Sequence, residues 1–144
     1  MTLTTDRYVS MAQVRDRAEL ARSIVGDGVV AMLNLLRFRA VADYSESPEL
    51  APEAPISGAE AYARYLELLK PRMIARGGEI LFWGDSGPFL VGPEQECWDK
   101  VLIVRWPSLR MLAGSQSDSE YLAVAGHRTA ALEDSRLLPI RQLQ

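Results

Sequence analysis

Three polar side chains stand among apolar neighbours, and they are the first candidates for chemistry. Asn34 interrupts the apolar run Met32–Leu36, and a buried amide needs partners, either in the protein or in a bound molecule. His127 is the only histidine, and imidazole is the side chain whose ordinary pKa lies closest to neutral pH. Arg37 lies beside the same run. It could clamp a substrate carboxylate, pair with a carboxylate of the protein, or sit at an exposed strand end.

His127 is the candidate catalytic residue if the protein is an enzyme, because it could act as a general acid or base at neutral pH. The alternative is a packing or capping histidine on a helix. One histidine could also hold a haem iron, but nothing else in the sequence indicates a haem pocket. We therefore expect no cofactor, and whether a reaction takes place stays open.

Aromatic and basic side chains could complete a pocket around these groups. Trp83 and Trp106 belong to apolar segments, and Tyr121 and Arg128 lie in the same helical segment as His127. Core packing or a dimer interface is the most economical explanation of the aromatic residues, and some of them could also line an apolar cavity. The predicted ligand-binding residues are Asn34, Arg37, Trp83, Trp106, Tyr121 and Arg128.

Other familiar sites are not indicated. The segment Gly84–Pro88 resembles the surroundings of the nucleophile in chymotrypsin-like proteases, but 144 residues are too few for two β-barrels. Turn formation between strands explains these residue types. Cys97 is the only cysteine, so a zinc site built from several Cys and His ligands is excluded within one chain. We predict no metal site.

Composition indicates an ordinary globular domain. Hydrophobic residues make up 48% of the chain and charged residues 24%, with a net charge of -3. A weakly acidic chain without a basic cluster is a poor candidate for binding nucleic acid or an anionic membrane. No apolar run is long enough to span a bilayer, and the start of the chain lacks the pattern of a signal peptide. We expect a cytoplasmic protein.

The elements that must position the candidate residues follow from hydrophobic periodicity, capping boxes and Gly or Pro breaks. Pro71 should kink or interrupt the second long helix near its end. The predicted helices are 10–25, 57–77, 108–112 and 117–134. The predicted strands are 29–38, 79–84, 98–106 and 137–143, with a short extension at 89–91 and Pro139 suited to a sheet edge.

After the first helix, this order is β-α-β-β-α-β, which predicts an α+β protein with a ferredoxin-like antiparallel sheet. We assign residues 1–27 to an N-terminal helical extension and residues 28–144 to the sheet domain. Two helices cover only one sheet face, yet the strands 29–38 and 98–106 are apolar on both. The simplest cover for the second face is another copy of the chain, which predicts a homodimer.

The long connection 39–56 contains three prolines and four acidic residues. A connection of this length is usually either functional or disordered. We expect a mobile, solvated excursion, and the alternative is a lid over a pocket.

Several segments resemble one family. They are the strand segment Asn34–Phe38, Gly77-Gly78 before a strand, Val104–Ser108, and Tyr121 followed by the segment from His127 to Leu138. They are similar to the domain of unknown function 1330, in the dimeric α/β-barrel superfamily. The resemblance covers about residues 28–140. It implies a ferredoxin-like protomer and a homodimer with facing sheets, and it implies no particular reaction.

Two hypotheses remain. In the first, the protein is a small-molecule binder or cofactor-independent enzyme with a pocket between sheet and helices, where Asn34 and His127 converge beside Trp83 or Trp106. In the second, it is a non-catalytic dimeric structural or interaction module. A concave cavity shared by Asn34 and His127 would favour the first, and a filled interior would favour the second.

Overall fold

Four strands form one antiparallel sheet in the computed structural model, which describes residues 11–143 apart from the side chains of the first two. The strand order is β2-β3-β1-β4. The strands are β1 (Val30–Phe38), β2 (Glu79–Asp85), β3 (Lys100–Trp106) and β4 (Leu132–Ile140). The helices are α1 (Met11–Val25), α2 (Gly58–Ala75), α3 (Leu109–Gln116) and α4 (Ser119–Ala131), with a 3-10 turn at Pro48–Leu50.

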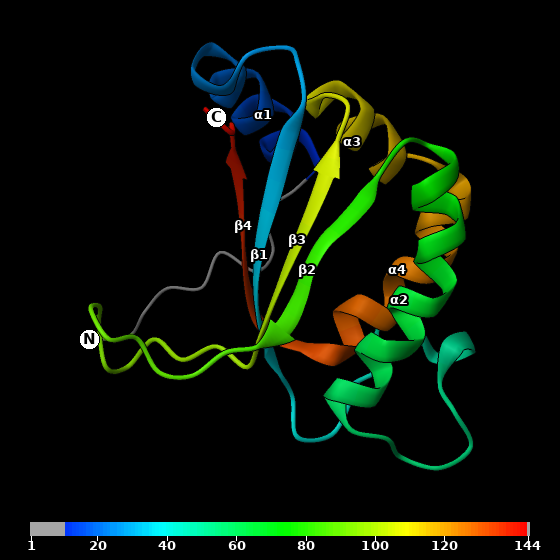
Figure 1. Cartoon of the computed structure of the whole chain (residues 1–144). Helices are drawn as coiled ribbons and strands as arrows, with labels where there is room; N and C mark the ends of the chain where they lie inside the picture. Colours follow the sequence, from blue (N-terminus) through cyan, green and yellow to red (C-terminus); the bar gives the residue numbers. More distant parts are fainter. Residues whose placement is uncertain (1–10, 144) are drawn as a thin grey trace.

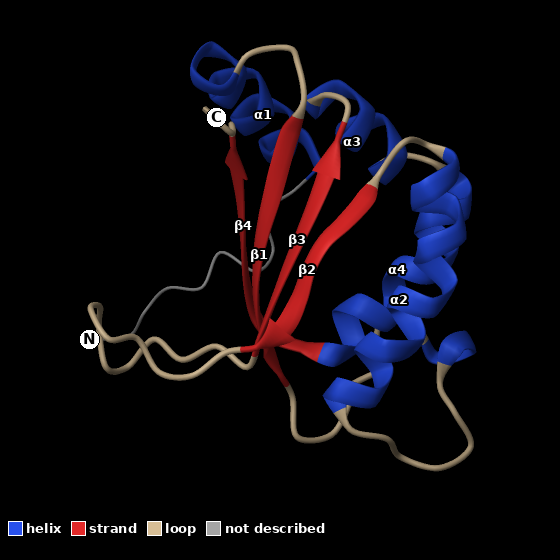
Figure 2. Ribbon diagram, viewed as in Figure 1, coloured by secondary structure: helices blue, strands red, loops and turns tan. Residues whose placement is uncertain are grey.

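Helices α2 and α4 pack against each other on one side of the sheet, as Figure 1 shows. Helices α1 and α3 lie over the end of the sheet where β1 begins and β3 ends (Figure 2). The element order with β1 and β3 at the centre is the predicted ferredoxin-like arrangement, so the fold prediction is confirmed. The sheet face opposite α2 and α4 carries no helix in the part of the chain described.

Alternation along β1 decides which side chains meet the helices. Val30, Met32 and Leu36 are buried, whereas Leu33 and Leu35 are partly exposed on the opposite face. The period of two residues in a strand produces this division. Met32 and Leu36 therefore face the helices, and Leu33 and Leu35 face away from them.

Helix α2 begins where the sequence predicted. The hydroxyl of Ser57 accepts a hydrogen bond from the backbone N–H of Glu60 at 3.0 Å, as in a capping box. Helix α2 continues through Pro71 to Ala75, so it is not interrupted there, and a kink at this proline stays a prediction. Met73, which is buried, packs that last turn on the core, and this packing outweighs the cost of proline in a helix.

The C-terminal part needs two corrections. The cap of α4 is Asp118, whose carboxylate accepts from the N–H of Glu120 at 3.1 Å, and not the expected Ser117. Ser117 instead ends α3, which reaches four residues beyond the predicted Leu112. Strand β4 begins at Leu132, five residues before the predicted start. It pairs only with β1, so the expectation of Pro139 at a sheet edge is confirmed.

The segment 39–56 is anchored, against the expectation that little would fix it. The side chain of Tyr44 is buried, and the N–H of Asp43 donates to the carbonyl of Ala130 at 2.9 Å. A Cβ at Gly126 of α4 would come within 2.6 Å of the Ser47 hydroxyl, so the segment lies directly on that helix. Helix α4 therefore holds the segment on the side away from the sheet.

Two further expectations concern the ends of elements. The extension predicted at Phe89–Val91 is part of an exposed loop between β2 and β3, which projects away from α2 and α4 (Figure 1). Helix α1 confirms the predicted first helix from Met11 onward, whereas its expected cap, Ser10, lies outside the described residues.

Within residues 11–143, no helix is long and apolar enough to cross a membrane.

Candidate functional site

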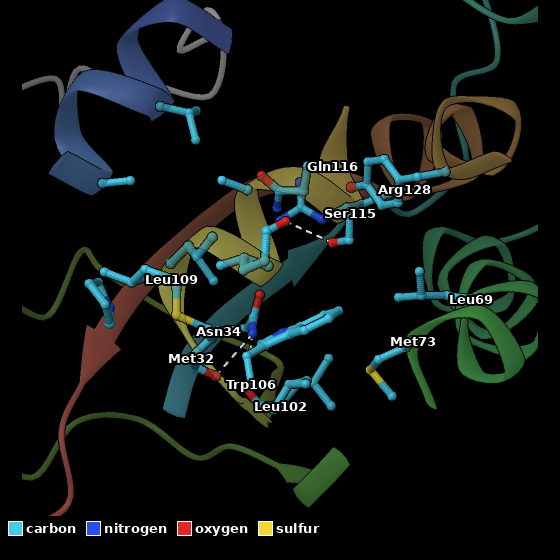
Figure 3. Close-up of a pocket in the computed structure, with 18 of the residues that line it drawn as sticks. Met32, Asn34, Leu69, Met73, Leu102, Trp106, Leu109, Ser115, Gln116 and Arg128 are labelled. Carbon is cyan, nitrogen blue, oxygen red and sulfur yellow. Dashed lines mark hydrogen bonds between the residues drawn. The ribbon is translucent and has the colours of Figure 1, made fainter. Parts of the chain in front are cut away.

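A pocket of about 640 Å³ lies between the covered face of the sheet and the helices (Figure 3). Its floor comes from β1, β3 and β4, and its walls come from all four α-helices. The apolar part of the lining consists mainly of Met32, Leu69, Met73, Leu102, Val104, Trp106, Leu109 and Leu112. This size and lining suit a small organic molecule with a large apolar surface.

Asn34 lies on the pocket floor, as predicted. Its amide nitrogen donates to the carbonyls of Leu102 at 3.2 Å and Met32 at 3.3 Å. These bonds use the donors of the amide and fix its orientation, which leaves the oxygen on the other side as an acceptor. Figure 3 shows that oxygen turned away from Met32, toward the pocket. A ligand N–H or O–H group could therefore bind there.

Tyr62, Tyr65 and Tyr121 form an aromatic cluster next to Arg128 at one end of the pocket. The hydroxyl of Tyr65 donates to that of Tyr121 at 3.3 Å, and the rings of Tyr62 and Tyr65 lie 5.3 Å apart. Burial raises the pKa of Tyr62 to about 12 and that of Tyr65 well above its usual range. Both phenols are therefore neutral at physiological pH.

Arg128 enters this cluster from α4 and lines the pocket, as does Tyr121. Burial lowers the pKa of its guanidinium, and the neighbouring Tyr62, Tyr65 and Tyr121 more than offset that effect. Its side chain therefore stays a cation. Arg128 is partly buried, whereas the side chain of Trp106 is buried and forms part of the floor near Asn34 (Figure 3). Four of the seven predicted site residues thus line one pocket: Asn34, Trp106, Tyr121 and Arg128.

His127 is not among the residues that line this pocket, so the predicted convergence with Asn34 was wrong. Its Nδ1 lies 2.8 Å from the hydroxyl of Tyr44, and the two rings meet edge to face. Successive residues of a helix point about 100° apart, so His127 faces the 39–56 segment while Arg128 faces the sheet. Burial, followed by the charge of Arg64, lowers the pKa of His127. A catalytic role for His127 stays an untested prediction.

Arg37 and Trp83 also lie outside the pocket lining. Arg37 follows the alternation of β1 onto the open sheet face, where its guanidinium is 3.6 Å from the carboxylate of Glu133. Trp83 is on the covered face of the edge strand, but it stacks on Tyr62 with ring centroids 5.9 Å apart. Trp83 therefore contacts Tyr62, a residue of the pocket lining, without lining the pocket itself.

The contributions of α1 and α3 to the pocket were not predicted from the sequence. Helix α3 provides Ser115 and Gln116, and α1 provides Val14, Ala18 and Ala21. The periodic apolar stripe of α1 was visible in the sequence, but its docking place was not. In the described part of the chain, no three His, Cys, Asp or Glu side chains are grouped to hold a metal.

Solved structures provide the comparisons. Two crystal structures of the RPA0582 protein, one of them of the methylated protein, share 33% identity with this chain. Their TM-scores are 0.76 and 0.75. Each match covers 90% of this chain, and the matches cover 92% and 94% of the two RPA0582 chains. RPA0582 comes from Rhodopseudomonas palustris and is described as a protein of unknown function.

A second neighbour is described as a dimeric protein of unknown function with a ferredoxin-like fold, from Bacteroides fragilis. It has a TM-score of 0.47 and 14% identity, over 80% of this chain and 97% of that chain. No protein-family model matches the chain, and no curated protein does. The resemblance to the domain of unknown function 1330 therefore stays a prediction. The 33% identity over nine-tenths of both chains shows that this chain belongs to the same family as the RPA0582 protein of Rhodopseudomonas palustris.

Proposed function

We propose that this protein binds a small, largely apolar organic molecule in the pocket between the sheet and the helices. The observation that carries the proposal is a cavity of about 640 Å³ whose apolar floor and walls surround a fixed amide acceptor, Asn34. Such a combination of apolar surface and a few polar groups is typical of ligand sites. The amide would orient the ligand, while burial of its apolar surface would provide most of the affinity.

We propose binding rather than acid–base catalysis as the primary activity. His127, the predicted general base, faces Tyr44 on the other side of α4. Tyr62 and Tyr65 stay protonated at neutral pH, so they are poor bases. Asp118 at the rim pairs with Arg76, and its hydrogen bond from the backbone of Glu120 and this ion pair hold its pKa below the usual range. None of these four side chains is placed and ionised as a general base for a ligand in the pocket, so we infer that the pocket positions a ligand and does not transfer a proton.

A titration with N-phenyl-1-naphthylamine, a neutral dye that fluoresces in apolar sites, tests this proposal. The wild-type protein should give a saturable increase in fluorescence. Ala113→Trp places an indole in the pocket wall and should weaken binding about tenfold, equivalent to about 1.4 kcal/mol. Leu122→Trp adds the same indole to the exposed side of α4, where it should have no effect.

A wild-type protein that fails to bind the dye saturably would contradict the proposal. Equal binding by the Ala113→Trp variant would also contradict it, because the dye would then occupy another site. In either case, the alternative of a non-catalytic dimeric module would become the better account.

We also propose that the protein forms a homodimer through the open face of the sheet. Phe82, Leu138 and Ile140 are exposed there, and partly exposed apolar side chains surround them. The partly exposed residues of this face include Ala31, Leu33, Leu35, Val101 and Ile103. A two-fold axis would let this single apolar patch cover itself, which would remove the cost of leaving it in water.

A further inference from the structure

Arg128 differs from three other arginines of the pocket lining because it has no carboxylate partner among the described residues. Each of those three has a carboxylate partner, and the pairs are Arg72 with Glu120, Arg76 with Asp118, and Arg136 with Asp134. Among the residues that the structure describes, no carboxylate lies within ion-pair distance of Arg128. Its polar neighbours are neutral: a guanidinium nitrogen is 3.5 Å from the hydroxyl of Ser135, and the side chain also hydrogen-bonds with Tyr62.

The tyrosine cluster cannot supply the missing negative charge. Tyr62 has a pKa of about 12 because of its burial, and that of Tyr65 is also well above the usual range. Neutral phenols can donate and accept hydrogen bonds around a guanidinium, but they leave its net charge uncompensated. A charged group removed from water without a counter-ion is unfavourable. The free protein therefore holds a partly buried cation without a carboxylate partner in the lining of the pocket.

We propose that the ligand of this pocket is an amphipathic monocarboxylate whose anionic group pairs with Arg128. A carboxylate can accept two parallel N–H bonds from one guanidinium. Tyr121, which accepts the hydroxyl of Tyr65, keeps its own hydroxyl hydrogen available for a further bond to the ligand. The apolar body would extend over Met32, Leu102 and Trp106 toward Asn34. This inference rests on the proposed function and adds the chemical class of the ligand.

One unpaired cation favours a single negative charge over a dianion. A phosphate monoester carries more than one negative charge at neutral pH and binds best where several donors converge. The other three arginines named above already have carboxylate partners. The remaining lining is mainly apolar, which suits an aromatic or aliphatic acid.

Calorimetric titration at pH 7.5 with 2-naphthoate and with the neutral, nearly isosteric 2-naphthamide tests the inference. The wild-type protein should bind the acid at least about tenfold more tightly, because a hydrogen bond to a charged group is worth more than one to a neutral group. Arg128→Met should remove that preference while retaining binding of the amide. A third titration, with 2-naphthyl phosphate, should show weaker binding than 2-naphthoate.

Arg72→Met is the matched control, because it removes an arginine from the same lining that already has a carboxylate partner. It should change the preference for the acid by less than about threefold. Arg128→Lys keeps the charge and should retain part of the preference. The lysine variant also serves if Arg128→Met does not fold.

The outcomes separate this inference from the proposed function. Equal affinity of the wild-type protein for acid and amide, together with dye binding, would overturn the inference and leave the proposed function intact. An unchanged preference in Arg128→Met, or tighter binding of the phosphate, would also overturn it. Failure of the wild-type protein to bind the dye and both naphthyl compounds would overturn the inference and the proposed function together.

Discussion

At the scale of single residues, Arg128 should lower the stability of the ligand-free protein. Its guanidinium is enclosed by Tyr62, Tyr65 and Tyr121 without a carboxylate in the described part of the chain. A partly buried charge that lacks a counter-ion carries a desolvation cost, and an apolar side chain in its place removes that cost. We expect Arg128→Met to raise the free energy of unfolding in urea by about 1 kcal/mol.

The control for this prediction is Arg136→Met. Arg136 also lines the pocket, but its guanidinium lies 2.7 Å from the buried carboxylate of Asp134. Removal of this partner leaves an uncompensated charge, so this variant should be less stable than the wild type. A loss of stability in both variants would show that Arg128 is not an uncompensated cation.

His127 should make stability depend on pH. Burial lowers its pKa below the ordinary value of 6.5, so the unfolded chain binds the proton more readily than the folded one. The contribution of the neutral imidazole is fully present above pH 6.5 and is lost as the pH falls through the lower, folded pKa.

We therefore expect the unfolding free energy of the wild type to decrease as the pH falls below about 6.5. The decrease should be smaller in His127→Gln, which keeps an acceptor for Tyr44 but does not titrate. Urea unfolding across pH 5 to 8 measures the difference. Identical pH profiles for the two proteins would contradict the lowered pKa.

The residue types of the site were partly predictable. Asn34 stood out because an amide in an apolar strand needs partners, and two backbone carbonyls and the pocket now account for it. The sequence favoured His127 as the catalytic candidate and offered its neighbour Arg128 as one of six ligand-binding residues. Which of two neighbours in a helix faces the sheet depends on how α4 is rotated, and this is determined by packing against α2 and the 39–56 segment.

At the scale of elements, the start of α2 is held by close backbone contact. A Cβ at Gly58 would lie 2.4 Å from the carbonyl of Arg39 and 2.5 Å from that of Ala131. Since backbone cannot give way easily, Gly58→Ala should lower the unfolding free energy by a few kcal/mol. Gly114→Ala in α3 meets no atom within 4 Å and should be stabilising by up to about 1 kcal/mol.

Thermal and urea unfolding of these two variants measure the effect. Because both changes add one methyl group at a helical glycine, their difference reports the close approach alone. A stability of Gly58→Ala equal to that of Gly114→Ala would contradict the tight junction between α2, β1 and α4.

Element types were predictable, and several of their ends were not. The caps Ser57 and Ser108 each accept a hydrogen bond from a backbone N–H three residues later. Because this contact is local in the chain, the starts of α2 and α3 could be predicted from the sequence. Strand β4 starts early at Leu132 because pairing with β1 extends it directly from the end of α4. The 39–56 segment resembled a mobile loop in composition, and its anchoring by Tyr44 depends on a distant helix.

At the scale of the whole molecule, the open sheet face predicts the assembly. Light scattering coupled to size exclusion should give twice the 16.0 kDa mass of one chain. Phe82→Glu and Leu138→Glu place charges on exposed parts of that face and should each favour the monomer. Leu122→Glu, on the exposed side of α4, should stay dimeric. A wild-type mass of one chain would contradict the proposed homodimer.

The ferredoxin-like arrangement followed from the order and periodicity of elements, because few topologies accommodate β-α-β-β-α-β in one sheet. The pocket did not follow in the same way. Helices α1 and α3 close its end, and their placement over the sheet depends on tertiary contacts that no local pattern specifies.

The central claim is that an organic acid occupies the pocket with its charge at Arg128. A crystal structure of the protein soaked in 2-naphthoate tests it most directly. The predicted result is a naphthyl ring between Trp106 and the helices, with a carboxylate oxygen within about 3 Å of the Arg128 guanidinium. A bound acid whose carboxylate lies away from Arg128, or a pocket without ligand at a saturating concentration, would contradict the claim.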